Sequence, residues 1–161
     1  MLLRRTFCML AGVAMLLWPA HATAQVYQIN VGGLPMSCSS FAGEPVMIIV
    51  NPNVQDVGVA HRNYYGAPAI ELNPYVLGRF SPIVQQWWFG HECAHHGLPP
   101  PMNTETNADC FSVRQLRQYG ILNNPQQLMA FQYELSMLPG SPMGHLPGPM
   151  RAQNIINCAL Y

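Results

Sequence analysis

The sequence predicts a single α+β domain, with a small sheet in its N-terminal half and helices in its C-terminal half. Short β-favouring runs, separated by Gly, Pro and Asn turns, occupy the first half. From Ile83 onward, apolar residues recur at three- and four-residue steps, as they do on an amphipathic helix. No internal repeat or low-complexity linker divides residues 25–161, so we expect one domain there.

The elements can be placed from their composition and their caps. The expected strands cover Val26–Val31, Val46–Val50 and Ala69–Leu72. The first helix begins at the Ser81-Pro82 cap and ends at Gly97, before three prolines, with Trp87 and Trp88 interpreted as core residues. The later helices are expected from Asn103 or Thr104 to about Tyr119, from Pro125 to about Leu138, and from Pro149 to Leu160.

Residues 1–24 have the pattern of a signal peptide rather than of folded structure. Arg4 and Arg5 precede the apolar run Phe7–Trp18, and Ala22-Thr23-Ala24 is a small-x-small cleavage site. The apolar run is too short to span a membrane, and no later stretch is long enough. We therefore expect an exported protein, periplasmic or secreted after cleavage near Ala24, with no transmembrane segment in the mature chain.

Charge is scarce in residues 25–161. They hold five Arg, no Lys and seven acidic residues, which gives a formal charge of −2. Such a surface lacks the basic patch that binds phosphates, which argues against nucleic acid as a partner. The chain contains 15 Pro and 13 Gly, which indicate a loop-rich fold built from short elements.

The most informative stretch is His91-Glu92-Cys93-Ala94-His95, within the first expected helix. Residues i and i+4 share one helix face, so His91 and His95 can present two imidazole nitrogens to one metal ion. Glu92 lies about 100° around the helix from His91, where it can reach a water at the metal but is poorly placed to be a ligand. This is the HExxH spacing of zinc hydrolases, with Glu as the general base.

A third protein ligand is expected from the next helix, because a catalytic zinc site takes three protein ligands and one open position. The helix stop and the prolines after it reverse the chain, and Glu105 follows in the first turn of the second helix. Asp109 lies one turn further along the same face. We expect Glu105 to bind the metal and Asp109 to accept a hydrogen bond from a ligating His. The alternative is an acidic first turn favoured by the helix dipole.

The two segments together resemble the signature of a known family. His91–His95 followed by Glu105-Thr106-Asn107-Ala108-Asp109 looks like the HExxH…ExxAD signature of gluzincin-type zinc metallopeptidases, in a compact form. The resemblance covers roughly residues 80–117, with a weaker similarity at residues 69–74. It implies a zincin-like domain in which a strand before the motif helix pairs with an extended peptide. That strand would be Ala69–Leu72, as an edge strand.

His145 and Arg151 are the candidates for stabilising an oxyanion on the attacked carbonyl. They lie in a segment that is faintly similar to those in which families of this clan place a His, Tyr or Arg after the metal helices. The alternative is an ordinary loop His and a helix-start Arg. Weaker candidates are Tyr64, Tyr65 and Tyr133; His96 is expected to be exposed, and His61 is left unassigned.

Four cysteines in an exported domain favour two disulfides. Cys93 lies about 155° from the midpoint of the His91/His95 face, so it points into the protein. We expect a Cys93–Cys110 bond between the two helices of the site and a Cys38–Cys158 bond between the ends of the domain. Buried free thiols are the alternative.

The expected function is that of an exported zinc-dependent metallohydrolase acting as a peptidase. Zinc would be held by His91, His95 and Glu105, with Glu92 as the general base. Two alternatives stay open. One is a zinc-stabilised binding module without activity, against which the presence of Glu92 argues. The other is a zinc amidase acting on a non-peptide substrate of the cell wall.

Overall fold

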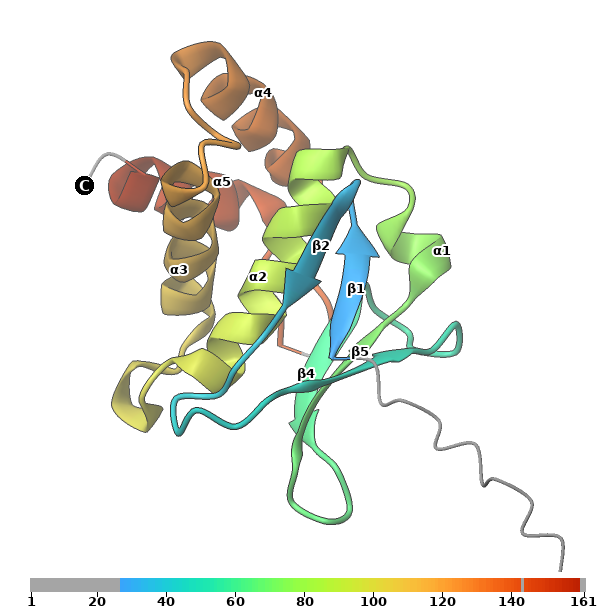
Figure 1. Cartoon of the computed structure of the whole chain (residues 1–161). Coiled ribbons are helices and arrows are strands. Elements are labelled where there is room, and N and C mark those ends of the chain that lie inside the picture. Colours follow the sequence, from blue (N-terminus) through green and yellow to red (C-terminus); the bar gives the residue numbers. More distant parts are fainter. Residues whose placement is uncertain (1–26, 143, 160–161) are drawn as a thin grey trace, which may run out of the picture.

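The computed structural model describes residues 27–142 and 144–159, which form the predicted α+β domain (Figure 1). The expected signal peptide, residues 1–24, lies outside the described residues. The strands are β1 (Gln28–Val31), β2 (Leu34–Ser37), β3 (Met47–Val50), β4 (Gly58–Arg62) and β5 (Pro68–Leu72). The helices are α1 (Pro74–Leu77), α2 (Pro82–Gly97), α3 (Glu105–Gln118), α4 (Pro125–Ser136) and α5 (Gly148–Ala159), with a 3₁₀ turn at Pro100–Met102.

The strands form two small sheets rather than the single one expected. β1 and β2 make an antiparallel hairpin, whose turn uses the positive φ angles of Gly32 and Gly33. The other sheet has the order β3-β5-β4, in which β3 runs parallel and β4 antiparallel to β5. The sequence prediction missed β2, β4 and the single turn of α1.

The expectation that Ala69–Leu72 forms an edge strand is wrong. This segment belongs to β5, which pairs with β3 on one side and with β4 on the other, so both of its edges are already occupied. Burial on both faces agrees with a central position, since Ala69, Ile70 and Leu72 are all buried. Among the described residues, β4 is an edge of this sheet, with no strand on its outer side.

Side-chain caps set the limits of the helices. Ser81 caps α2 and Thr104 caps α3, where the Thr104 hydroxyl accepts from the Asn107 N–H, and Asn124 caps α4 in the same way. α2 packs against α3, α4 and strands β1 and β4, while α5 packs against α3 and α4. The buried residues of α2 include Trp87, Trp88 and Phe89. Trp87 and Trp88 lie in the core as predicted. No helix among the described residues is long and apolar enough to cross a membrane.

Both disulfides are present, but with a different pairing from the expected one. Cys38 bonds to Cys93, and Cys110 bonds to Cys158. α2 and α3 meet through the Gly90 and Ser112 side of each helix, where the Ser112 hydroxyl donates to the Trp87 carbonyl at 2.7 Å. Cys93 therefore faces the end of β2 and not α3. Cys110 faces α5, which carries Cys158.

The closeness of α2 and α3 gives a first prediction. A Cβ at Gly90 would clash with the Ser112 hydroxyl and lie 3.2 Å from the Ser112 Cβ. We expect Gly90→Ala to lower the free energy of unfolding by about 1–3 kcal/mol, because the helices must move apart. Urea unfolding measures the change.

Gly97→Ala is the matched control in the same helix. There a Cβ would meet its nearest atoms at 3.6 and 3.9 Å, which is ordinary contact. We expect its stability to stay within about 0.5 kcal/mol of the wild type. Equal losses in both variants would contradict a specific close approach at Gly90.

Candidate metal centre

Three side chains from α2 and α3 bring possible metal-ligating atoms close together. His91 Nε2 and His95 Nε2 lie 3.2 Å apart, one helix turn from each other. Glu105 reaches them from the first turn of α3, with Oε2 at 3.3 Å from His91 Nε2 and Oε1 at 3.3 Å from His95 Nε2. Neighbouring vertices of a tetrahedron with bonds of about 2.0–2.1 Å are about 3.3 Å apart, so the spacing fits a zinc ion.

His145 is an alternative to His95 as a metal ligand. It lies with His91 and Glu105 in a group whose possible ligand atoms are all within 4.8 Å of one another. Its two ring nitrogens are already engaged by carboxylates, however. Nδ1 lies 2.7 Å from Asp56 Oδ2, and Nε2 lies 3.2 Å from Glu92 Oε1. A ring that donates from both nitrogens has no lone pair for a metal. His95 is therefore the better candidate for a ligand beside His91 and Glu105.

Each histidine of the triad has a polar partner behind it. Asp109 Oδ1 lies 2.8 Å from His91 Nδ1, both groups being fully buried, although the bent geometry leaves neither with a regular hydrogen bond. Asn103 holds His95 twice, because its Oδ1 lies 2.8 Å from His95 Nδ1 and its Nδ2 donates to the His95 carbonyl. Such contacts fix the ring orientation and the tautomer of a metal ligand. Asp109 was expected in this place, whereas Asn103 was considered only as a helix cap.

Burial and hydrogen bonding act in opposite directions on the carboxyl group of Glu105. Burial raises its pKa, but contacts with His91 and His95 outweigh burial and hold the pKa well below its usual range. Burial also lowers the pKa of His95, and the contacts with Glu105 and Asn103 raise it overall. Glu105 is therefore ionised at neutral pH, as a metal ligand must be.

Glu92 lies beside the triad and is only 1% exposed. Burial raises its pKa, yet His145 and the charges of His91 and His95 lower it below the usual value, so the group is an ionised carboxylate. Its position depends on Gly58 of β4, where a Cβ would lie 3.3 Å from Glu92 Cγ. A buried carboxylate next to an open cleft has the position and charge of a general base.

An open cleft of about 370 Å³ borders these groups. Its lining comes from the edge strand β4, from the second half of α2, from the segment that joins α2 to α3, from the start of α3 and from the loop before α5. His95, Glu105, Glu92 and His145 all contribute to the wall, which consists of Val59–Arg62, Glu92, His95, His96, Asn103, Glu105 and His145.

The structure changes the assignment of several other residues. Arg151 is 1% exposed on α5 and does not line the cleft, so it is not placed to stabilise an oxyanion there. Tyr64, Tyr65 and Tyr133 are exposed and do not line it either. His96 is half-buried and not exposed, because its ring bonds to the Ala69 carbonyl at 2.9 Å. His61 lies 3.0 Å from Glu71.

Asp56 is the residue of the site that the sequence analysis missed. It lies in the loop before β4, far along the chain from both His145 and Glu92, and no motif surrounds it. Burial raises the pKa of Asp56, but its contacts with His145 and Ser141 lower it overall. Only the folded chain brings Asp56, His145 and Glu92 into one row.

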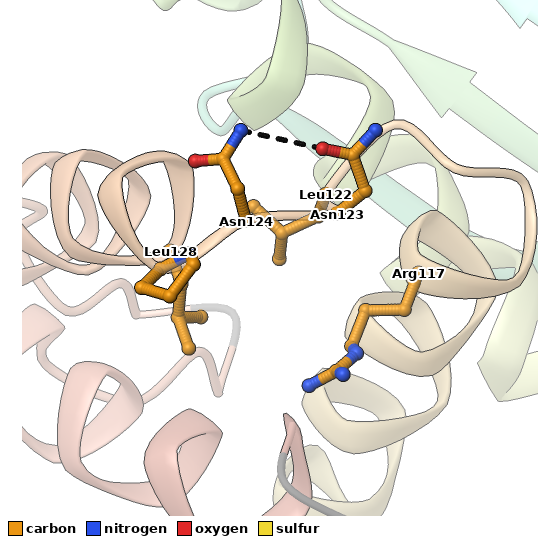
Figure 2. A pocket seen from close by; sticks show the side chains of 6 residues that line it. Arg117, Leu122, Asn123, Asn124 and Leu128 are labelled. Carbon is orange, nitrogen blue, oxygen red and sulfur yellow. Dashed lines mark hydrogen bonds between the residues drawn. The ribbon is translucent and has the colours of Figure 1, made fainter.

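A second hollow, of about 220 Å³, lies where the end of α3 meets the start of α4 (Figure 2). Its lining side chains are Arg117, Leu122, Asn123, Asn124, Pro125 and Leu128. Arg117 is the one titratable group among them, and the hollow contains no acid–base pair or ligand cluster. The cleft beside the triad is therefore the candidate functional site.

His145 should titrate well above an ordinary histidine. Burial lowers its pKa, but the contacts with Asp56 and Glu92 outweigh burial and raise it to about 9. Because the folded pKa is higher than the unfolded value of about 6.5, protonated His145 stabilises the fold below that pH, and the contribution is lost as the pH rises through about 9. An NMR titration of chelator-treated protein measures the pKa directly.

Asp56→Asn should move the pKa of His145 back towards its ordinary value and flatten the loss of stability between pH 7 and 10. Glu71→Gln is the control, since it removes a carboxylate that contacts His61 instead. A wild-type His145 that titrates near pH 6.5 would contradict the arrangement.

Comparison with known proteins assigns no family to this geometry. The chain matches no protein-family model, no curated protein and no solved structure. The resemblance to gluzincins thus rests on the His91–His95 and Glu105–Asp109 segments alone, and function has to be argued from the side chains.

Proposed function

We propose that the protein is an exported zinc-dependent metallohydrolase that acts as a peptidase. The observation that carries the proposal is the convergence of His91, His95 and Glu105 at tetrahedral spacing beside the buried, ionised Glu92. Two nitrogens and one carboxylate oxygen are a ligand set that suits zinc. A purely structural zinc site has no need of an adjacent general base or of an open cleft, which argues against a non-catalytic binding module.

Zinc at this point would supply a polarised carbonyl and an activated water. Glu92 is the group that takes the proton of the attacking water and passes it to the leaving amine. His145, protonated and held by Asp56, faces Glu92 through Nε2. Once Glu92 is protonated, its attraction for the Nε2–H weakens, and that N–H can donate to the oxyanion on the attacked carbonyl.

The edge strand β4 supports a polypeptide as the substrate. Hydrogen bonds from the Asn63 N–H to the Ala67 carbonyl and from the Asn73 N–H to the Val57 carbonyl set the ladder between β4 and β5. In an antiparallel ladder alternate residues point outward, so the backbone groups of Gly58, Ala60 and Arg62 face the open edge beside the cleft. An extended peptide can add to that edge as a further strand. This feature favours a peptide over a non-peptide amide of the cell wall.

Export is part of the same proposal. The domain contains two disulfides, Cys38–Cys93 and Cys110–Cys158, and such bonds persist in oxidising compartments. The signal-peptide pattern of residues 1–24 supports the same location.

The metal and the base can be tested separately. Purified wild-type protein should contain one zinc ion per chain, and His91→Ala and Glu105→Ala should lose it. Glu92→Gln should keep the zinc but lower kcat for a peptide substrate by about 10²–10⁴-fold, because the proton acceptor is gone. Metal analysis and a peptide-library cleavage assay, with and without a chelator, measure both effects.

Glu134→Gln serves as the matched control, since Glu134 is a carboxylate on α4 that does not line the cleft. It should keep both zinc and activity. An active Glu92→Gln variant would refute the proposed base, and zinc binding without cleavage of either peptides or cell-wall amides would favour the binding module.

Ala60→Pro tests the edge strand. Proline removes the outward N–H of Ala60 but no hydrogen bond of the β4–β5 ladder. We expect kcat/KM for peptides to fall roughly tenfold, as for a lost hydrogen bond of about 1.4 kcal/mol, with zinc content unchanged. His61→Pro is the contrast, because it removes a ladder bond and should destabilise the sheet itself. Unchanged kcat/KM in a folded Ala60→Pro protein would exclude strand addition at β4.

A further inference from the structure

We propose that Arg151 is a positioning residue that holds Glu105 in the orientation of a metal ligand; the inference rests on the proposed function. Arg151 is among the largest fully buried side chains of the described residues, with 1% of its surface exposed. A guanidinium stays charged in proteins, and burying a charge is costly unless it is paired. Its burial therefore depends on the groups around it.

Two carboxylates of α3 supply the pairing. Arg151 Nη2 donates to Glu105 Oε2 at 3.0 Å, and Nη1 lies 3.5 Å from Asp109 Oδ1. Nε donates to the Leu146 carbonyl at 3.1 Å, which fixes the remaining edge of the guanidinium. One cation thus contacts both the third ligand of the triad and the acid behind His91.

The guanidinium lies over the rings of two neighbouring tryptophans of α2. Its central carbon lies 5.1 Å from the ring centre of Trp87 and 4.6 Å from that of Trp88. These are cation–π contacts, which strengthen where water is excluded. Trp87 and Trp88 stand one turn before His91 on the same helix. The tryptophans of α2, the helix of His91 and His95, therefore hold Arg151 in place, and Arg151 in turn contacts Glu105 on α3.

Without Arg151, Glu105 would lose its orientation. The carboxylate lies in the first turn of α3 with its side chain 26% exposed, and Arg151 contacts it in addition to the two histidines whose proposed metal it would share. Glu105 and Asp109 also lie one turn apart and would repel each other. Lysine cannot replace arginine here, because one ammonium does not make the forked contact with two carboxylates.

The test measures zinc affinity by competition with a chromophoric chelator, together with the visible absorption of the Co²⁺-substituted protein. We expect Arg151→Met to bind zinc about 10–100-fold more weakly, as for other residues that support metal ligands. The cobalt spectrum should change because the ligand geometry changes. Arg151→Lys keeps a cation beside the two tryptophans and so should stay folded, yet it should show a similar loss.

Arg114→Met is the matched control, since Arg114 also links α3 to α5, by donating to the Cys158 carbonyl, without touching Glu105. It should keep wild-type zinc affinity. In a Glu105→Gln background, Arg151→Met should weaken zinc binding less than roughly twofold, because the carboxylate that it positions is absent.

Wild-type zinc affinity and an unchanged cobalt spectrum in a folded Arg151 variant would overturn the inference. An equally large loss in the Glu105→Gln background would do the same, since it would indicate a role in packing alone. The proposed function fails by a different result, namely a wild-type protein that binds no zinc or cleaves nothing.

Discussion

The position of Glu105 between His91 and His95 is the constraint on which the rest of the site depends. A carboxylate at 3.3 Å from both imidazoles can be reached only if α3 starts close beside the last two turns of α2. Gly90 makes this possible, because its missing side chain admits Ser112 against the α2 backbone. The 3₁₀ turn and the Thr104 cap then place Glu105 in the first turn of α3. The arrangement of the three candidate ligands is thus a consequence of how two helices pack.

The buried charged groups of this site are stable only because positively and negatively charged side chains alternate along the network. From the loop before β4 inward, Asp56, His145 and Glu92 follow one another at 2.7 and 3.2 Å. Behind the histidines, Asp109 lies between His91 and the guanidinium of Arg151. Each ionised group thereby has an opposite charge as its neighbour, which offsets the cost of removing it from water. The loss of any one member removes a counter-charge from its neighbours in a buried environment.

The sequence predicted what is decided locally and missed what depends on tertiary packing. The HExxH spacing, the caps of α2 and α3 and the position of Glu105 are set by residues within one or two helix turns of each other. The disulfide pairing depends instead on which helix faces are in contact, and Cys93 turned out to face β2. β4 contains Gly, His and Arg, so its composition gave no strand signal, and without it β5 was taken for an edge. Asp56 reaches His145 across 89 positions of sequence, a distance at which no spacing rule applies.

The correction of the edge strand makes the argument for a peptide substrate more specific. Gly58 is at once a residue of the open edge and the residue that leaves space for Glu92, since a Cβ there would lie 3.3 Å from Glu92 Cγ. A chain that pairs with the outward backbone groups of Gly58 and Ala60 would therefore pass near Glu92, the proposed general base. Had β5 been the edge, the pairing surface would lie one strand, about 4.8 Å, away from Gly58 and Ala60. With β4 instead of β5 as the edge strand, the proposed peptide-binding edge and the proposed catalytic groups lie beside the same cleft.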